Sequence, residues 1–136
     1  MVREIVRDEK LLSQISEKAT IDDIDIATDL FDTLTANAGG CVGMAANMIG
    51  ELKRIIIVDD NDNYIIMFNP VILKKSDVYE TNEGCLSLEG LRATRRYKKI
   101  KVEYQNEKMQ RRIKTFTDFT AQIIQHEIDH CNGILI

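Results

Sequence analysis

The chain has 136 residues, of which 44% are hydrophobic and 29% are charged, and this balance excludes an intrinsically disordered protein. The net charge of −4 excludes nucleic-acid binding that is driven by overall charge. No apolar run approaches the roughly 20 residues that are needed to cross a bilayer, which excludes a membrane-spanning helix.

The N-terminal segment, residues 1–12, has neither the apolar core nor the small-residue cleavage site of a secretion signal. We therefore expect a cytoplasmic protein. In that reducing compartment, the odd number of cysteines favours free thiols or metal ligands over disulfides. The chain contains no internal repeat and no linker, which predicts one domain over residues 1–136.

The first predicted helix spans Thr20 to Asn37. Thr20 can cap its N-terminus, and Asp23 stands at the acidic position of a capping box. Apolar residues follow at the spacing of one helical face: Ile24, Ala27, Phe31 and Leu34. The next segment, residues 36–43, is small and contains glycine, which predicts a loop.

Short runs of β-branched and aromatic residues predict the strands. Arg54–Val58 and Tyr64–Phe68 flank a run of Asp and Asn residues, which predicts two strands joined by a polar turn. Pro70 is expected to end the second of these strands. Hydrophobic and charged residues alternate from Ile100 to Tyr104, the pattern of a half-buried strand. Two further strands are predicted at Val71–Leu73 and Arg111–Phe116.

The last predicted element is a helix that begins near Thr117 or Asp118, either of which can cap it. It ends at Asn132-Gly133, a common pair at helix C-termini. Strands dominate the middle of the chain and this helix closes it. The fold class that this order predicts is α+β, with short antiparallel β-sheets packed around a C-terminal helix.

The closing helix carries the chemistry, in the sequence HEIDH. His126 and His130 are the only histidines of the chain, and a spacing of four residues places both on one helical face. Both rings can therefore reach one metal ion. Glu127 lies beside that face, where a carboxylate can act on a water molecule at the metal. A pair of structural surface histidines is the alternative interpretation, which the adjacent Glu127 disfavours.

A catalytic metal site needs about three protein ligands and an open position, so one ligand is missing from this helix. Cys131 is a poor choice, because the residue next to His130 is rotated by about 100° around the helix. Cys41 lies in the glycine-containing loop and Cys85 lies in the sequence EGCLS. Spacing alone does not decide between Cys41 and Cys85.

Two motifs together resemble the peptide deformylases. Glu83–Ser87 (EGCLS) and His126–His130 (HEIDH) match the second and third signature motifs of that family at every defining position. Gly43–Ala46 and the run Arg54–Val58 resemble the first motif and the strand after it. The resemblance spans roughly residues 24–134, and the combination of EGCLS with HEIDH is far more specific than either motif alone.

The resemblance implies a metal-dependent amide hydrolase. Cys85, His126 and His130 would ligate one divalent ion, ferrous iron in most deformylases, with zinc, nickel or cobalt able to take its place. The implied reaction is removal of the N-formyl group from formyl-methionyl nascent peptides of bacteria, with release of formate.

The resemblance also implies roles for residues around the metal. Glu127 would take a proton from the attacking water and pass it to the leaving amine. The backbone N–H of Leu86 would stabilise the developing oxyanion. Gly43 would allow the substrate backbone to approach closely, and Arg92 would contact the substrate. Asp129 is expected to support the helix or a nearby arginine, Arg95 or Arg96.

The first motif departs from the family pattern Gly-x-Gly-x-Ala-Ala-x-Gln. Cys41 replaces the first glycine and Met48 replaces the glutamine, whose side chain donates to the formyl oxygen in the family. A thioether cannot donate, and loss of one such donor typically slows a reaction by about 10²–10³. Rescue by the amide of the neighbouring Asn47 would need a shift of the backbone. Reduced activity is therefore expected.

Two alternatives follow from this departure: a deformylase-like amidase for another small N-acyl substrate, or a non-catalytic metal-binding domain. Ten of the 18 basic residues lie in the stretch 92–114. They form either a solvated strand face or a patch that contacts the ribosome. We expect a monomer that takes an N-formylmethionyl peptide as substrate and contacts neither a membrane nor a specific nucleic-acid sequence.

Overall fold

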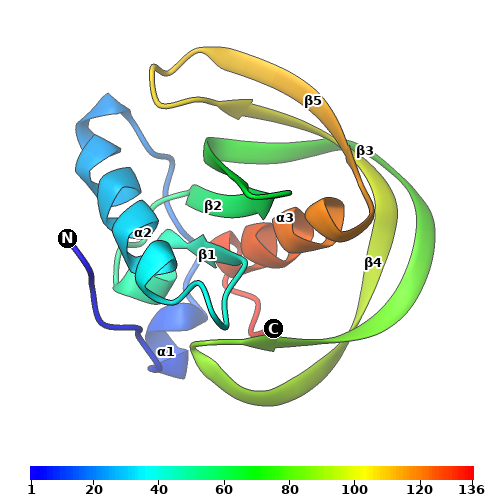
Figure 1. Cartoon of the computed structure of the whole chain (residues 1–136), viewed down its shortest axis with the longest axis horizontal. Helices are drawn as coiled ribbons and strands as arrows, with labels where there is room; N and C mark the ends of the chain where they lie inside the picture. Colours follow the sequence, from blue (N-terminus) through cyan, green and yellow to red (C-terminus); the bar gives the residue numbers. More distant parts are fainter.

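One five-stranded antiparallel sheet forms the frame of the protein. In the computed structural model, which describes residues 1–136, the strand order is β1-β2-β3-β4-β5 (Figure 1). The chain therefore has one continuous sheet where several short ones were expected, although the α+β class and the antiparallel pairing are confirmed. The strands are β1 (Gly43–Ala45), β2 (Ile55–Asp60), β3 (Asn63–Cys85), β4 (Leu88–Gln105) and β5 (Arg111–Thr117).

The predicted polar turn joins β2 to β3 and is shorter than the sequence suggested. Asp60 pairs with Asn63, so that only Asn61 and Asp62 remain outside the strands. Both have positive φ angles, 52° and 72°. Asn and Asp adopt this left-handed conformation more readily than most residues, and two such residues in succession suit a two-residue hairpin turn.

The prediction that Pro70 ends a strand was wrong. β3 continues through Pro70 to Cys85 and includes the separately predicted strand Val71–Leu73. The register shifts between Phe68 and Val71, and Asn69 has a φ angle of 53°. A bulge at this point explains the tolerance, since proline is accepted where the ladder needs no N–H donor.

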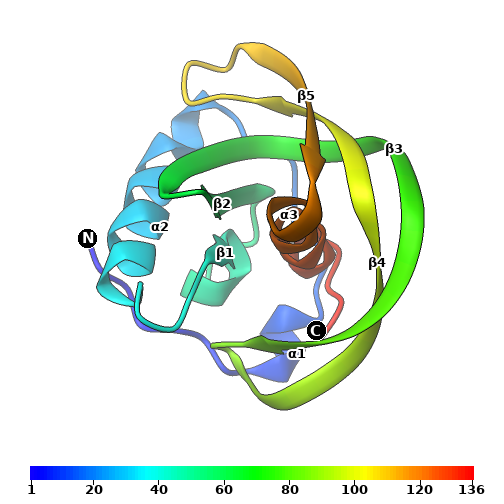
Figure 2. The same cartoon turned by 45° about the vertical axis from the view of Figure 1, so that its right-hand side comes forward.

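A long β3–β4 hairpin, which the sequence did not predict as such, brings EGCLS to the site. Its strands pair from Phe68 with Gln105 to Cys85 with Leu88 and curve around the closing helix (Figure 2). The predicted strand Ile100–Tyr104 is the part of β4 that packs into the core beside α3, and the predicted strand Arg111–Phe116 is confirmed as β5.

The closing helix, α3 (Asp118–Cys131), lies within the curve of the sheet (Figures 1 and 2). Its predicted ends are confirmed, because extended Thr117 precedes it and Asn132 follows it. A core cluster joins α3 to the concave face of β2–β5; the sheet contributes Ile56, Val58, Met67, Ile100, Val102, Tyr104 and Phe116. No helix of the protein combines the length and apolar character needed to span a membrane.

The first predicted helix packs on the other face of the sheet. It consists of a short turn, η1 (Ile21–Asp23), followed by α2 (Ile24–Ala36), and the predicted capping box between Thr20 and Asp23 is confirmed. A second core cluster lies between α2 and β2–β3, including Leu30, Leu34, Ile55, Ile57 and Phe68. The sequence had not predicted α1 (Glu9–Leu12), β1 or the turn η2 (Ala46–Ile49).

Candidate metal centre

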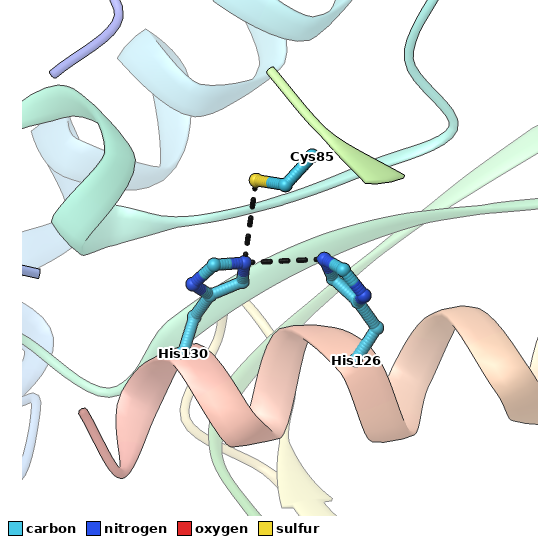
Figure 3. Close-up of side chains that lie close together, drawn as sticks. All are labelled: Cys85, His126 and His130. Carbon is cyan, nitrogen blue, oxygen red and sulfur yellow. Dashed lines mark hydrogen bonds between the residues drawn. The ribbon is translucent and has the colours of Figure 1, made fainter. Parts of the chain in front are cut away.

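Three side chains from two distant elements converge beside α3. Cys85 is the last residue of β3, whereas His126 and His130 are one turn apart on α3 (Figure 3). The Cys85 Sγ lies 3.4 Å from the His130 Nε2, which lies 3.1 Å from the His126 Nε2. All three potential ligand atoms lie within 4.8 Å of one another. Cys41 is not part of this group, which resolves the choice between the two cysteines geometrically.

These distances fit one shared metal ion. Metal–sulfur bonds of about 2.3 Å and metal–nitrogen bonds of about 2.0–2.1 Å at tetrahedral angles separate ligand atoms by roughly 3.4–3.6 Å. The observed separations of 3.4 Å and 3.1 Å are close to this range. His130 is fully buried and His126 is 8% exposed, whereas Cys85 is half-buried.

The two histidine rings differ in how readily they take a proton. Burial lowers the pKa of His126, but hydrogen bonds to Cys85 and Glu83 outweigh burial and raise it to about 10. Burial and the neighbouring His126 lower the pKa of His130 to about 3. One ring therefore takes a proton far more readily than the other, because Glu83 favours a charge on His126 and that charge disfavours a second one on His130.

Glu83 orients the first histidine. Its Oε1 accepts from the His126 Nδ1 at 2.7 Å, which places the single proton of a neutral, metal-binding ring on Nδ1 and directs Nε2 at the proposed metal position. Arg96 makes a two-pronged ion pair with Glu83, and its Nη1 contacts Asp129 at 2.6 Å. The prediction that Asp129 supports a nearby arginine is confirmed for Arg96. Burial disfavours the Glu83 carboxylate, but the bonds from His126 and Arg96 lower its pKa to about 2.

Glu127 is buried next to β1. The side chain is 4% exposed, and its Oε1 has no hydrogen-bond partner in the protein. Burial raises the pKa of its carboxyl to about 7. A Cβ at Gly43 would lie 3.0 Å from the Glu127 Oε2 and only 2.6 Å from the Ile123 Cγ2. Glycine is therefore required at position 43 by the close approach of β1 to α3.

A cavity of about 480 Å³ opens beside these residues. Glu127, His126, Cys85, Leu86 and Gly43 line it. Leu86 lies in the β3–β4 turn, and its backbone N–H donates to no acceptor within the protein. Further lining residues that the sequence had not singled out are Asn82, Phe119, Gln122 and Ile123. Of these, Gln122 was detectable in principle, because it lies one helical turn before His126 on the same face of α3.

Cys41 and Met48, the two residues that depart from the first family motif, both line this cavity. Met48 lines the wall on η2 and is 1% exposed, and the Cys41 thiol donates to the Gly43 carbonyl at 2.9 Å. The Asn47 Nδ2 donates to the His130 carbonyl at 3.0 Å, so its amide points into the core and not into the cavity. Arg92 does not line the cavity; its guanidinium contacts the Glu89 carbonyl.

A half-buried thiol and two buried imidazoles, with a carboxylate beside them at the wall of a cavity, are the groups of a metal-dependent hydrolase. A family model described as polypeptide deformylase matches residues 2–136. The chain belongs to this family, and the resemblance drawn from EGCLS and HEIDH is confirmed.

Known relatives agree with this assignment. The chain is 51% identical to a peptide deformylase of Clostridium beijerinckii over 136 residues, the whole length of both chains. It is 38% identical to one of Desulfotalea psychrophila over 119 residues, which cover 82% of this chain and 69% of the relative.

Solved structures share the fold. A class I type b peptide deformylase of Acinetobacter baumannii bound to Met-Ala-Ser superposes with a TM-score of 0.89 at 30% identity, covering 99% of this chain and 97% of that one. For the peptide deformylase of Thermus thermophilus the TM-score is 0.87 at 31% identity, covering 99% of this chain and 83% of that one.

Proposed function

We propose that this chain is a peptide deformylase, a metal-dependent hydrolase that removes the N-formyl group from formyl-methionyl nascent peptides and releases formate. The observation that carries the proposal is the convergence of Cys85, His126 and His130 beside Glu127 in one cavity. Family membership over residues 2–136 supports the reaction.

In this proposal, Cys85, His126 and His130 hold the ion. When bound, a divalent ion supplies Lewis-acid activation of water and of the formyl carbonyl. We expect ferrous iron, and zinc, nickel or cobalt are alternatives that suit the same thiolate and imidazole ligands. Glu83 keeps the His126 Nδ1 protonated and so leaves the opposite nitrogen free to coordinate.

Glu127 is the proposed general base and acid. Its carboxylate takes a proton from the water that attacks the formyl carbon and delivers that proton to the amine nitrogen as the C–N bond breaks. The products are formate and a free α-amine. The buried Glu127 Oε1, which has no partner in the protein, is the atom available for this transfer.

The oxyanion that develops on the formyl oxygen needs donors. The unengaged N–H of Leu86 is the proposed backbone donor, and Met48 stands where the family supplies a second donor from glutamine. We therefore propose reduced turnover, by about 10²–10³ if no other group replaces the missing donor. Gly43 would let the substrate backbone lie close to the wall, and a contact between Arg92 and a longer substrate remains a prediction.

The test is formate release from a formyl-Met-Ala peptide under anaerobic conditions with iron-loaded protein. Activity should disappear in Glu127→Ala and rise in Met48→Gln, while metal content stays equal in all three proteins. Absence of turnover in the parent at full metal occupancy, with no gain in Met48→Gln, would contradict the proposal.

An amidase for another small N-acyl group is the second candidate. The observation that favours it is the wall formed by Cys41 and Met48, whose sulfur-containing side chains reshape the region where the acyl group would lie. Comparison of N-formyl, N-acetyl and N-propionyl peptides tests it, since hydrolysis of a longer acyl group with an inert formyl peptide would favour the amidase. If the protein hydrolyses none of the three peptides, the remaining hypothesis is a non-catalytic metal-binding domain.

We propose that the protein acts in the cytoplasm as a monomer and contacts the ribosome through part of the basic stretch 92–114. Arg96 is buried in the Glu83 ion pair and is excluded from that contact. Lys99 and Lys101 remain available, and with Lys74 and Lys75 they surround a hollow of about 460 Å³. Charge reversal of Lys99 and Lys101 should weaken co-sedimentation with ribosomes, whereas reversal of Lys10 on α1 should not.

A further inference from the structure

The Glu83 carboxylate has a complete set of hydrogen-bond donors. A carboxylate offers about four lone-pair positions, two on each oxygen. The Oε1 receives the His126 Nδ1 at 2.7 Å and the Arg96 Nη2 at 2.7 Å. The Oε2 receives the Arg96 Nε at 2.9 Å and the Gln122 Nε2 at 2.9 Å. Gln122 is thus the donor that completes the second oxygen.

The orientation of the Gln122 amide is set from its other side. The Tyr79 hydroxyl donates to the Gln122 Oε1 at 3.0 Å, which turns the amide NH₂ toward Glu83. In the flipped orientation, the amide oxygen would face the carboxylate and repel it. Tyr79 belongs to β3 and Gln122 to α3, so the pair also connects the two elements that carry the metal ligands.

We infer that Gln122, held by Tyr79, is a positioning residue that fixes the Glu83 carboxylate and thereby aims the His126 Nε2 at the metal. This inference rests on the proposed metal site. Gln122 and His126 are four residues apart on one face of α3, and Glu83 bridges them. Displacement of Glu83 would therefore be passed directly to the imidazole ring.

Arg96 alone does not hold the carboxylate in this place. Its Nη1 is also bound to Asp129 at 2.6 Å, and Asp129 lies on the opposite side of His126 along α3. Without Gln122, the Oε2 of the buried Glu83 carboxylate would lose one donor, and Glu83 could pivot toward Arg96. The hydrogen bond to His126 would then lengthen or bend.

The alternative is that Gln122 only fills space in the cavity wall. Gln125 provides a matched control, since it lies on the same helix and is buried, but bonds to Tyr97 and to the Ala121 carbonyl and not to Glu83. Methionine has a similar volume to glutamine and no amide. Gln122→Met and Gln125→Met therefore remove the same group from two positions, of which only one touches Glu83.

The experiment measures the dissociation constant for Co²⁺ by competition with a chelator, in the parent, Gln122→Met, Tyr79→Phe and Gln125→Met. Loss of a hydrogen-bonding partner behind a metal-bound histidine typically weakens metal binding by about 10–100-fold. Because Gln122 acts through Glu83, we expect about 10-fold for Gln122→Met, a smaller loss for Tyr79→Phe, and no loss for Gln125→Met. A second readout is the NMR resonance of the His126 Nδ1 proton, which should move upfield or broaden in Gln122→Met and stay in place in Gln125→Met.

Cobalt affinity in Gln122→Met within twofold of the parent, with an unmoved His126 resonance, would overturn the inference. Equal weakening in Gln122→Met and Gln125→Met would also overturn it, because that result indicates a general packing effect. If Gln122→Met does not fold, Tyr79→Phe tests the inference in its place, because Tyr79 is half-buried and its substitution is expected to be tolerated. Loss of the Tyr79 hydroxyl should still weaken cobalt binding. Neither cobalt affinity nor the His126 resonance depends on deformylation. A protein without deformylase activity would therefore not by itself contradict the role inferred for Gln122.

Discussion

The cavity has two contrasting walls. The metal wall (Glu83, Cys85, Gln122 and His126) is polar and densely hydrogen-bonded, and the apolar wall (Cys41, Gly43 and Met48) is small or sulfur-containing. Glu83, Cys85 and His126 of the metal wall match the family motifs, whereas the apolar wall departs from them twice. A buried polar network fails when one member is lost, but an apolar wall needs only a suitable volume. This difference explains why the departures from the family motifs lie in the apolar wall and not among the metal ligands.

The largest effect is expected from substitution of Arg96, the ion-pair partner of Glu83 in the metal wall. Arg96→Met leaves the Glu83 carboxylate, whose side chain is 4% exposed, without its ion-pair partner. Removal of one partner of a buried pair typically lowers the free energy of unfolding by about 3–5 kcal/mol. Urea unfolding measures this loss, and Glu83→Gln added to Arg96→Met should recover part of it. A loss below about 1 kcal/mol would show that the pair is replaceable by solvent.

The next effect is expected at Gly43 of the apolar wall, where β1 lies against α3. The methyl group of Gly43→Ala would lie 2.6 Å from the Ile123 Cγ2, and such overpacking typically costs about 1–3 kcal/mol. Gly39→Ala is the control, because its Cβ would meet no atom within 4 Å. Thermal unfolding of both variants tests this contrast; equal stability of the two would mean that β1 moves freely away from α3.

A smaller effect is expected at Asn47, which connects η2, the turn that carries Met48, to α3 by a hydrogen bond. Asn47→Leu removes one bond to the His130 carbonyl, worth about 0.5–1.5 kcal/mol of unfolding free energy. Because the amide points away from the cavity, turnover of formyl-Met-Ala should change little. A 10²-fold fall in kcat with unchanged metal content would instead indicate that Asn47 supplies the missing donor.

The smallest effect concerns the reactivity of the apolar wall. Burial raises the pKa of the Cys41 thiol to about 11, so at pH 8 about one molecule in a thousand carries the thiolate. Alkylation of Cys41 by iodoacetamide, followed by peptide mass spectrometry, should accelerate about tenfold per pH unit up to about pH 11. A plateau at pH 9 or below would contradict the burial argument. The unfolded chain provides the reference rate.

The sequence predicted the parts of the site that depend on local geometry. His126, Glu127 and His130 are related by the pitch of one helix, and the Thr20–Asp23 capping box spans four residues, so their arrangement follows from spacing. Spacing could not decide between Cys41 and Cys85, because that choice depends on where a hairpin ends relative to a helix.

The long-range parts of the fold were not predictable in the same way. The exposed half of the β3–β4 hairpin lacks a clear hydrophobic alternation, and a bulge at Asn69 carries β3 past Pro70. The Tyr79–Gln122 bond joins residues 43 positions apart in two elements. Neither helical nor strand periodicity carries information about such a contact.

The position of α3 within the sheet has a consequence for how the protein forms. All five strands precede α3 in the chain, so a growing chain exposes the concave face of the sheet until the helix is synthesised. Cys85 is therefore made before His126 and His130, which arrive with the helix that covers the core. In the proposed site, the full set of ligands therefore forms only when α3 covers the core, so an ion held there would stabilise the folded chain over the unfolded one.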